Sequence, residues 1–567
     1  MPLRAPAQVM RLARMGAAFP NRLSFARVLL RHMIRHRWRI TRGQSVLDAN
    51  GHGHQLWHVD TPEQRYTLVA FSQCLDPRQR TDRVIANAWD ATFTLFDGDP
   101  DEATIERLRH DVPRQEAGRY QASELVLARA NRSVRLFEHV VDRLACGRQP
   151  RLALVKRIGY LMRTTAVYGN GKFGIADRGD FDTRPGLAPP FAAEMLTVYL
   201  IRCFSIDLAE HLARQRAPAE ATRLDAGLKR YLGIGNATGL GMAPFLVNHP
   251  RLLHRWFLAR ERALARVRAW RWPPGETLQA LHALVEHARA HVEEWQVEDR
   301  RQAQRLAVLR EELARLRQHL LTRPLDGLRR PFDALWRWSE QARLSLECQE
   351  LLVALLIECA GPRVDDLAAQ MSAPESPPLD PSWTLSRVLD AIQHDQAWAL
   401  AIDFEDPAQS QRFWYVSEEK AEPRLGNRYR EPGAELEIPL AIARDLQRLR
   451  LAVLACQRRT PTPTLPGFLL AHPWARAIVH RLQLVDDHPY AEIRDNLIAA
   501  DTRPIDLLRC KLAFFGATRF DPKSDLWTRI ALFQGAPLPE DIARGEAEDP
   551  ALAIAPQQSD RAHPSRG

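Results

Sequence analysis

The longest stretch without glycine or proline constrains this chain most. It covers residues 276–323, with Pro273 and Pro274 before it and Pro324 after it. At 1.5 Å per residue, this stretch can form up to about 70 Å of continuous α-helix if it does not bend. Its second half has leucines at alternating spacings of three and four, the a and d positions of a short heptad seam: Leu306, Leu309, Leu313, Leu316 and Leu320.

Two interpretations of this leucine seam remain open. The helix either packs inside its own domain, or it forms a dimerising or antiparallel coiled coil, and two heptads are too few to decide. The sequence therefore predicts a long-helix segment over residues 273–370, with a coiled-coil hairpin within the chain and a homodimer through the long helix as its two alternative arrangements.

Helical periodicity recurs along most of the remaining chain. Strand-like alternation is found in two places, residues 55–60 with 65–72 and residues 398–404 with 412–416, each pair flanking a turn-like segment. We therefore predict a mainly α, multi-domain helical protein in which two small β-hairpins or small sheets form a minor α+β component. The predicted helices cover residues 77–95, 100–109, 122–145, 191–214, 331–360, 438–456, 474–484 and 490–498.

The chain is too long for one ordinary hydrophobic core, since it has 567 residues. A Pro- and Ser-rich segment reads as a linker, and the polar, acidic end of the chain is typical of disorder. The predicted units are a basic N-terminal helix (1–45), an α-rich domain with a small hairpin and two glycine-rich loops (46–272), the long-helix segment (273–370), the linker (371–382), a C-terminal α+β domain (383–536) and a disordered tail (537–567).

The formal net charge of +10 permits an anionic partner, and the excess is concentrated at the N-terminus, where no acidic residue precedes Asp48. Residues 21–40 are predicted to form a basic helix that either lies on its own domain or contacts phosphate or a membrane surface. Seven scattered cysteines without a CxxC pair indicate a reduced, cytoplasmic protein. The absence of an apolar run of eighteen residues predicts no membrane span.

The segment GYLMRTTAVYGNGKFG, residues 159–174, is the first candidate site. Its closely spaced glycines allow backbone N–H groups to form an anion-binding nest beside Arg163, Asn170 and Lys172. The spacing excludes a P-loop, because Phe173 stands where that motif has Ser or Thr. Lys172, one of only six lysines, is the candidate general base, with Tyr168 as a proton relay. The alternative is a turn that ends a helix and leaves the lysine in solvent.

A second glycine-rich segment, GIGNATGLG at residues 233–241, resembles a dinucleotide-binding fingerprint only superficially. That fingerprint follows a buried strand, and here the flanking sequence is predicted to be helical. We interpret it as a loop between helices in which Asn236 and Thr238 contact a ligand, or as a site of close helix packing. Lys420, in SEEKAEPR, is a further candidate for substrate binding, although such a charged run is commonly a solvated loop.

Three histidines near the first hairpin, His52, His54 and His58, are metal-ligand types, but with Asp60 they make no complete ligand set. We therefore predict no metal site, and the cofactor stays unknown.

The leading functional prediction is a cytosolic enzyme that acts on a small anionic metabolite, of unassigned reaction class. Its predicted catalytic residues are Lys172 and Tyr168, and its predicted substrate-binding residues are Arg163, Asn170, Asn236, Thr238 and Lys420. The alternative is a non-catalytic nucleic-acid-binding or scaffold protein that uses the basic N-terminus and the long helix. Acidic residues are interleaved with the basic ones along the chain, and this pattern favours the enzyme hypothesis over the nucleic-acid-binding hypothesis.

Overall fold

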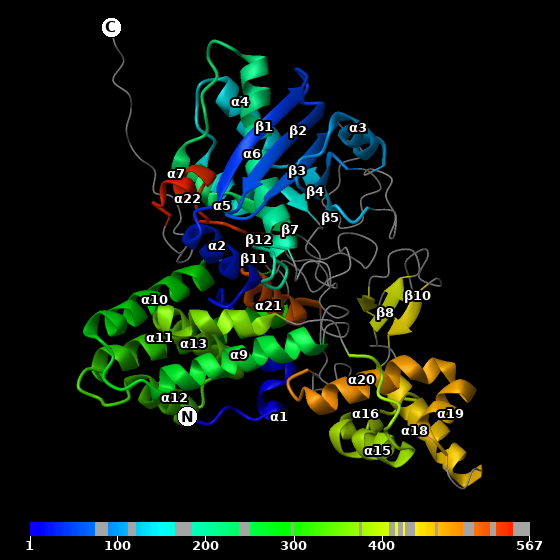
Figure 1. Cartoon of the computed structure of the whole chain (residues 1–567). Coiled ribbons are helices and arrows are strands. Elements are labelled where there is room, and N and C mark those ends of the chain that lie inside the picture. The colour runs from blue at the N-terminus through cyan, green and yellow to red at the C-terminus, as the bar shows by residue number, and fades with distance from the viewer. Residues whose placement is uncertain are drawn as a thin grey trace.

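A computed structural model provides the structure of the chain (Figure 1). It describes residues 1–567 except 74–88, 112–120, 165–183, 237–249, 296, 298–299, 373–376, 407–413, 418–422, 426–436, 441, 460–462, 492–503, 522–528 and 548–567. A large β-sheet and its helices form one part of the molecule, and a bundle of helices lies beside it. A smaller helical unit lies against the bundle at the right in Figure 1.

The large sheet has nine strands in the order β1-β2-β3-β4-β5-β6-β7-β12-β11. Within it, β6 and β7 pair in parallel and the other neighbours pair antiparallel. The strands are β1 (Arg39–Leu47), β2 (Gly53–Asp60), β3 (Arg65–Ser72), β4 (Ala91–Asp97), β5 (Glu124–Arg132), β6 (Tyr160–Thr164), β7 (Gly233–Asn236), β11 (Ala517–Asp521) and β12 (Arg529–Leu532).

This sheet shows that the predicted fold class, a mainly α protein with two small hairpins, is wrong. The first predicted hairpin is confirmed as β2 and β3. However, β4 begins within the helix predicted over 77–95, whose residues 77–88 lie outside the described residues. The helix predicted over 122–145 is wrong in its first part, which forms β5, and is confirmed in its last part as α4 (Phe137–Ala145). Strands that are buried on both faces read as nearly continuous apolar runs, so periodicity does not separate them from buried helices.

Each face of the sheet is covered by a different helix. The predicted helix over 191–214 is confirmed as α6 (Ala192–Arg216), which lies across β3 to β7 and stacks Phe204 edge-on against Phe93 of β4. On the other face, α3 (Glu102–Asp111) buries Ile105 and Leu108 against side chains of β2, β3 and β5, including Leu127. Because α3 is short, it covers only part of that face.

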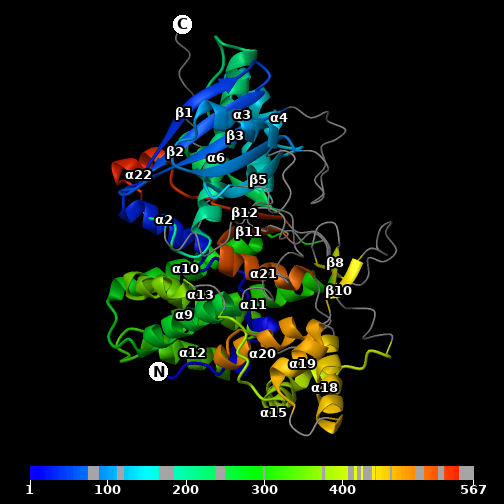
Figure 2. The same ribbon diagram turned by 45° about the vertical axis from the view of Figure 1, so that its right-hand side comes forward.

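The predicted long helix is a helical hairpin (Figure 2). It divides into α10 (Gly275–Glu293) and α11 (Arg300–Thr322), and all five leucines of the seam are buried, with α11 packed on α10 and α13 of the same chain. The seam therefore packs inside the chain, and its leucines are not exposed for a second copy. The bundle is completed by α9 (Pro250–Ala269), α12 (Pro331–Gln341) and α13 (Leu346–Cys359).

The N-terminal segment belongs to the main hydrophobic core. Its helices α1 (Pro6–Val9) and α2 (Phe25–Arg35) bury Val9, Phe25 and Met33 in a core that also includes the sheet and the bundle. In Figure 1, α2 lies between the sheet and the bundle, whereas α1 lies at the side of the bundle away from the sheet, and β1 follows closely after α2.

A second core is formed by residues 383–482 in the smaller helical unit. The second predicted hairpin is wrong in its first strand, because α16 (Ala397–Leu400) occupies that position. Instead, β8 (Trp414–Ser417) is the central strand between β10 (Glu437–Leu440) and β9 (Pro423–Leu425). The unit's other helices include α15 (Leu385–Asp390), α18 (Ile442–Arg459), α19 (Leu465–Ala471) and α20 (Arg476–Asp487).

After this unit, the chain returns to the large sheet through α21 (Pro504–Phe515), β11 and β12. The helix α22 (Pro539–Arg544) then contacts β1, although the sequence predicts a disordered tail from residue 537. Among the described residues, no helix has both the length and the apolar character needed to cross a bilayer.

Candidate functional site at the polar end of the sheet

The parallel strands β6 and β7 end side by side, at Thr164 and Asn236. The side-chain amide of Asn236 donates a 2.6 Å hydrogen bond to the backbone carbonyl of Thr164. The two glycine-rich segments of the sequence continue from these two strand ends. In sheets with parallel strands, ligands commonly bind outside the carboxyl ends of those strands. This end of the sheet is therefore a candidate ligand-binding site.

The glycines in the first half of GIGNATGLG are explained by close packing of the strand. A Cβ atom at Gly235 would lie 2.6 Å from ring atoms of Tyr160, and one at Gly233 would collide with the backbone carbonyl of Leu532. The interpretation of this part of the segment as a loop between helices is therefore wrong, because residues 233–236 form the buried strand β7.

Two arginines lie on one face of the sheet near these strand ends. Asn131 is paired directly with Arg163, and Arg129 with Thr92 of β4. Since side chains alternate along a strand, Arg129, Asn131 and Arg163 share one face, the face that α3 covers farther along the sheet. Diagonal neighbours of this kind have Cβ atoms roughly 7–8 Å apart, so the two guanidinium groups can reach the same ligand.

Hydrogen bonds fix the backbone around these arginines. The Asp90 amide donates to Oδ1 of Asn131 at 2.8 Å, and the Arg132 amide donates to Oδ2 of Asp90 at 2.9 Å. The Thr164 hydroxyl donates to the Arg129 carbonyl at 3.0 Å. We define the polar end of the sheet as Asp90, Arg129, Asn131, Arg163, Thr164 and Asn236; all are buried except Arg129, which is half-buried.

The electrostatics favour an anion at the polar end. Burial lowers the pKa of the Arg129 guanidinium to about 10, which leaves it charged at neutral pH. Its guanidinium carbon also lies 5.5 Å from the ring centre of Trp89, so the indole supports one side of the arginine. Two partly desolvated guanidinium groups on one face are suited to a carboxylate or phosphate.

The structure brings together two of the predicted substrate-binding residues. Arg163 is paired in register with Gly235, the residue before Asn236. The other predicted site residues, Lys172, Tyr168, Asn170, Thr238 and Lys420, lie outside the described residues.

The sequence prediction missed Asp90, Arg129 and Asn131. The usable signal was the alternation of polar and small residues at 128–131, ARAN, which is typical of a strand. Because the sequence predicts a helix over 122–145, this alternation does not indicate a site there.

The three histidines near the first hairpin have separate partners. His52 is near Asp48, His54 contacts Arg109, and His58 lies 3.1 Å from Asp99. In the part of the chain that the structure describes, no group of three potential metal ligands forms.

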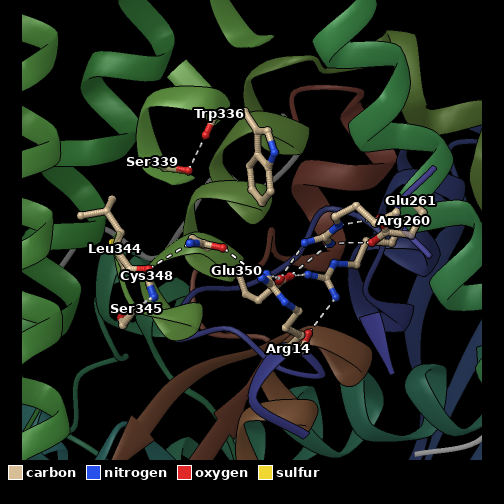
Figure 3. Close-up of polar contacts among 11 residues, drawn as sticks. Arg14, Arg260, Glu261, Trp336, Ser339, Leu344, Ser345, Cys348 and Glu350 are labelled. Carbon is tan, nitrogen blue, oxygen red and sulfur yellow. Dashed lines mark hydrogen bonds and ion pairs between the residues drawn. The ribbon is translucent and has the colours of Figure 1, made fainter. Parts of the chain in front are cut away.

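A second cluster of charged residues lies deep in the bundle (Figure 3). The fully buried carboxylate of Glu350 on α13 pairs with Arg4 and Arg14, each at 2.7 Å, and with Arg260 on α9. Arg4 also pairs with Glu261 at 2.6 Å. Burial lowers the pKa of Arg14 to about 10 and that of Arg260 to about 9.

The same arrangement is repeated farther along the N-terminal segment. Arg22 and Arg31 pair with Asp365, and Arg27 pairs with Glu358 at 2.8 Å. These arginines therefore attach the N-terminal segment to the bundle. Since buried ion pairs of this kind are shielded from solvent, we interpret the cluster as structural.

Fold and site together define a helix-rich protein with a mixed, mainly antiparallel nine-stranded sheet whose polar end carries two arginines. Comparison with known proteins gives no match: no family model fits the chain, and no curated protein or solved structure is significantly similar to it.

Proposed function

We propose that the chain is an enzyme that binds a small anionic metabolite at the polar end of the sheet. The observation that carries this proposal is the position of Arg129, Asn131 and Arg163 on one face, next to the carboxyl ends of the parallel strands β6 and β7. Guanidinium groups bind carboxylates and phosphates through paired hydrogen bonds, and partial burial strengthens such contacts because the local dielectric is lower.

Catalysis is assigned to residues that follow β6 in the sequence. Lys172 is the proposed general base, and Tyr168 is the proposed proton relay. Asn170, Thr238 and Lys420 are proposed to bind substrate together with Arg163 and Asn236. These roles rest on residue type and spacing in the sequence, and the reaction class is left open.

The nucleic-acid alternative is less well supported. It uses the arginines at the N-terminus, but Arg4, Arg14, Arg22 and Arg27 are buried and paired with carboxylates of the bundle. These side chains are therefore not available to an external phosphate backbone.

Thermal unfolding with a panel of carboxylate and phosphate metabolites tests the binding site. A ligand at a hundred times its Kd stabilises the folded state by about 2.7 kcal/mol. We expect at least one metabolite of the panel to raise the melting temperature of the unmodified chain. We expect Arg163→Gln to lower the affinity for that ligand at least about tenfold, which is equivalent to the loss of one hydrogen bond to a charged group. The matched control is Arg289→Gln, which removes an arginine paired with Glu286 at the surface of the bundle. Equal ligand stabilisation of both variants would falsify the site.

The proposed base is tested separately by Lys172→Arg, which keeps the charge. Once a ligand is found that the chain turns over, this variant should bind it normally but lose turnover, because a guanidinium does not deprotonate near neutral pH. A fully active variant removes Lys172 from the mechanism.

A further inference from the structure

Two loops lie next to each other at one end of the helical bundle. Residues 270–274 connect α9 to α10, and residues 323–330 connect α11 to α12. The backbone amide of Trp272 in the first loop donates a 3.1 Å hydrogen bond to the carbonyl of Arg329 in the second. This end of the bundle is on the left in Figure 1, away from the smaller helical unit. We call these two loops, with the last turn of α11, the bundle tip.

Large apolar side chains are exposed at the bundle tip. Trp272 is 62% exposed, Leu321 is 56% exposed and Leu328 is 43% exposed. Single exposed apolar residues are ordinary on protein surfaces. Here Trp272 and Leu328 lie on the two adjoining loops, and Leu321 lies in the last turn of α11, which leads into the second loop. Exposed apolar residues grouped at one end of a domain mark sites of contact with proteins or membranes.

The backbone of Trp272 has an unusual conformation. Its φ is 53°, in the left-handed region that bulky residues rarely adopt. Its side chain is mostly in solvent, so packing within the chain does not explain why a tryptophan occupies this position. A strained and exposed residue of this kind points to a function that requires the side chain.

Basic residues lie close in the sequence to these three apolar residues. Arg271, Arg323 and Arg329 are exposed, whereas the exposed acidic residues of the two connections are Asp326 and, at the start of α10, Glu276. The tip therefore combines exposed apolar residues with an excess of positive charge. Tryptophan and leucine insert at the boundary between lipid headgroups and acyl chains, and nearby arginines are attracted to anionic headgroups.

We propose that the bundle tip docks on an anionic lipid surface, with Trp272, Leu321 and Leu328 inserted and Arg271, Arg323 and Arg329 against the headgroups. Single-stranded nucleic acid is the other polyanion that binds tryptophan and arginine, by stacking of bases on aromatic rings. The structure favours lipid, because two of the three exposed apolar residues are leucines, which cannot stack on bases. This proposal is independent of the proposed function.

Sedimentation of the full chain with vesicles tests the proposal. The probes are vesicles of phosphatidylcholine alone and vesicles that contain phosphatidylserine as well. We expect binding to the anionic vesicles, weaker binding at high salt, and little binding to the neutral vesicles. Trp272→Gly and Leu328→Ser should each lower the vesicle partition coefficient by about tenfold, the order expected for removing one large buried apolar side chain. The double variant Arg271→Gln, Arg329→Gln should bind the anionic vesicles more weakly, and its binding to the neutral vesicles should not change.

The matched control is Leu470→Ser, which removes a leucine that is 83% exposed on α19 of the smaller helical unit. It should bind vesicles as the unmodified chain does. Trp272→Gly is also informative about folding, since glycine adopts this φ without strain and the variant should keep the melting temperature of the unmodified chain.

Three outcomes would overturn the proposal. The first is no binding to anionic vesicles, and the second is equal loss of binding in the Leu470→Ser control. The third is salt-sensitive binding of a fluorescent single-stranded oligonucleotide that Trp272→Gly removes, without vesicle binding, because it would identify the tip as a nucleic-acid surface.

Discussion

The guanidinium of Arg202, fully buried on α6, donates a 2.7 Å hydrogen bond from Nε to the backbone carbonyl of Leu232. The same group also donates to carbonyls of Lys229 and Arg230 before β7 and of Ala536 and Pro537 after β12. One arginine thus ties α6 to two segments that are distant in the sequence. Because Leu232 directly precedes β7, this contact also positions the strand that carries Asn236.

Replacing Arg202 with Met should destabilise the fold strongly. The variant leaves several buried carbonyl groups without a donor, and we expect a loss of about 3–5 kcal/mol in the free energy of unfolding. Urea denaturation measures this loss. The control is Arg42→Met, which removes a more exposed arginine that contacts Asp207 of the same helix, and it should change stability by about 1 kcal/mol or less. Similar values for the two variants would contradict the role given to Arg202.

Adding a methyl group at Gly235 should destabilise the fold, because the new methyl group would clash with the ring of Tyr160. Gly235→Ala places a Cβ atom against the tyrosine ring, and we expect a loss of about 1–3 kcal/mol. The control is Gly275→Ala, since a Cβ at Gly275 has no atom within 4 Å. A double-mutant cycle with Tyr160→Ala should show that the two losses are not additive, because the smaller side chain removes the clash. If the two losses of stability are additive, the loss caused by Gly235→Ala does not arise from a clash with Tyr160.

The hydrogen bond from Asn236 to Thr164 should matter for ligand binding. Asn236→Asp replaces the donor with an acceptor that faces a carbonyl oxygen, and we expect it to lower stability by about 1–3 kcal/mol and to weaken ligand binding. Denaturation and ligand titration measure the two effects. Normal affinity in a variant that is clearly destabilised would separate this strand end from the binding site.

The buried Glu350 cluster should be essential for stability and insensitive to salt. Glu350→Gln leaves three buried guanidinium groups with one carboxylate fewer, so we expect a loss of about 3–5 kcal/mol. The control is Glu286→Gln at the surface, where Arg289 and Arg317 are its partners; its effect should be about 1 kcal/mol or less and should fade with salt. A small loss for Glu350→Gln would contradict the role given to Glu350 in holding the N-terminal segment on the bundle.

Acid should weaken the contact between α9 and the segment after α20. Burial, with a smaller contribution from His488, lowers the pKa of His254 to about 4, and the Tyr490 amide donates to its Nδ1 atom. Because the pKa is lower in the folded than in the unfolded state, the unfolded state binds more protons between about pH 6.5 and 4. Stability should therefore fall by roughly 1–2 kcal/mol over that range, allowing for the partial exposure of the ring. His254→Gln should flatten this part of the pH profile.

Some of the fold follows from local sequence patterns. The β2–β3 hairpin and helix α6 are confirmed where alternation and helical periodicity predict them. In contrast, β11 and β12 join the sheet beside β7, which lies almost three hundred residues earlier in the chain, and no local pattern contains that pairing. Of the arrangements that the sequence leaves open for residues 276–323, the hairpin of α10 and α11 forms because the leucines pack on two neighbouring helices, which is a tertiary effect.

The candidate site was predicted in part. Arg163 and Asn236 were chosen from separate glycine-rich segments, and the register of β6 and β7 brings them together. Arg129 and Asn131 were missed because their strand was assigned to a helix. The distance between two strand ends depends on sheet order, and the sequence of one chain does not reveal that order.

The order of the strands has a consequence for synthesis of the protein on the ribosome. The edge of β7 that pairs with β12 stays open until residues 529–532, almost three hundred residues later in the chain, have left the ribosome. An unpaired strand edge is prone to pairing with other chains. The nascent chain must therefore pass through a long period with an exposed sheet edge, so its yield in cells should depend on chaperones that hold it until β11 and β12 have been synthesised.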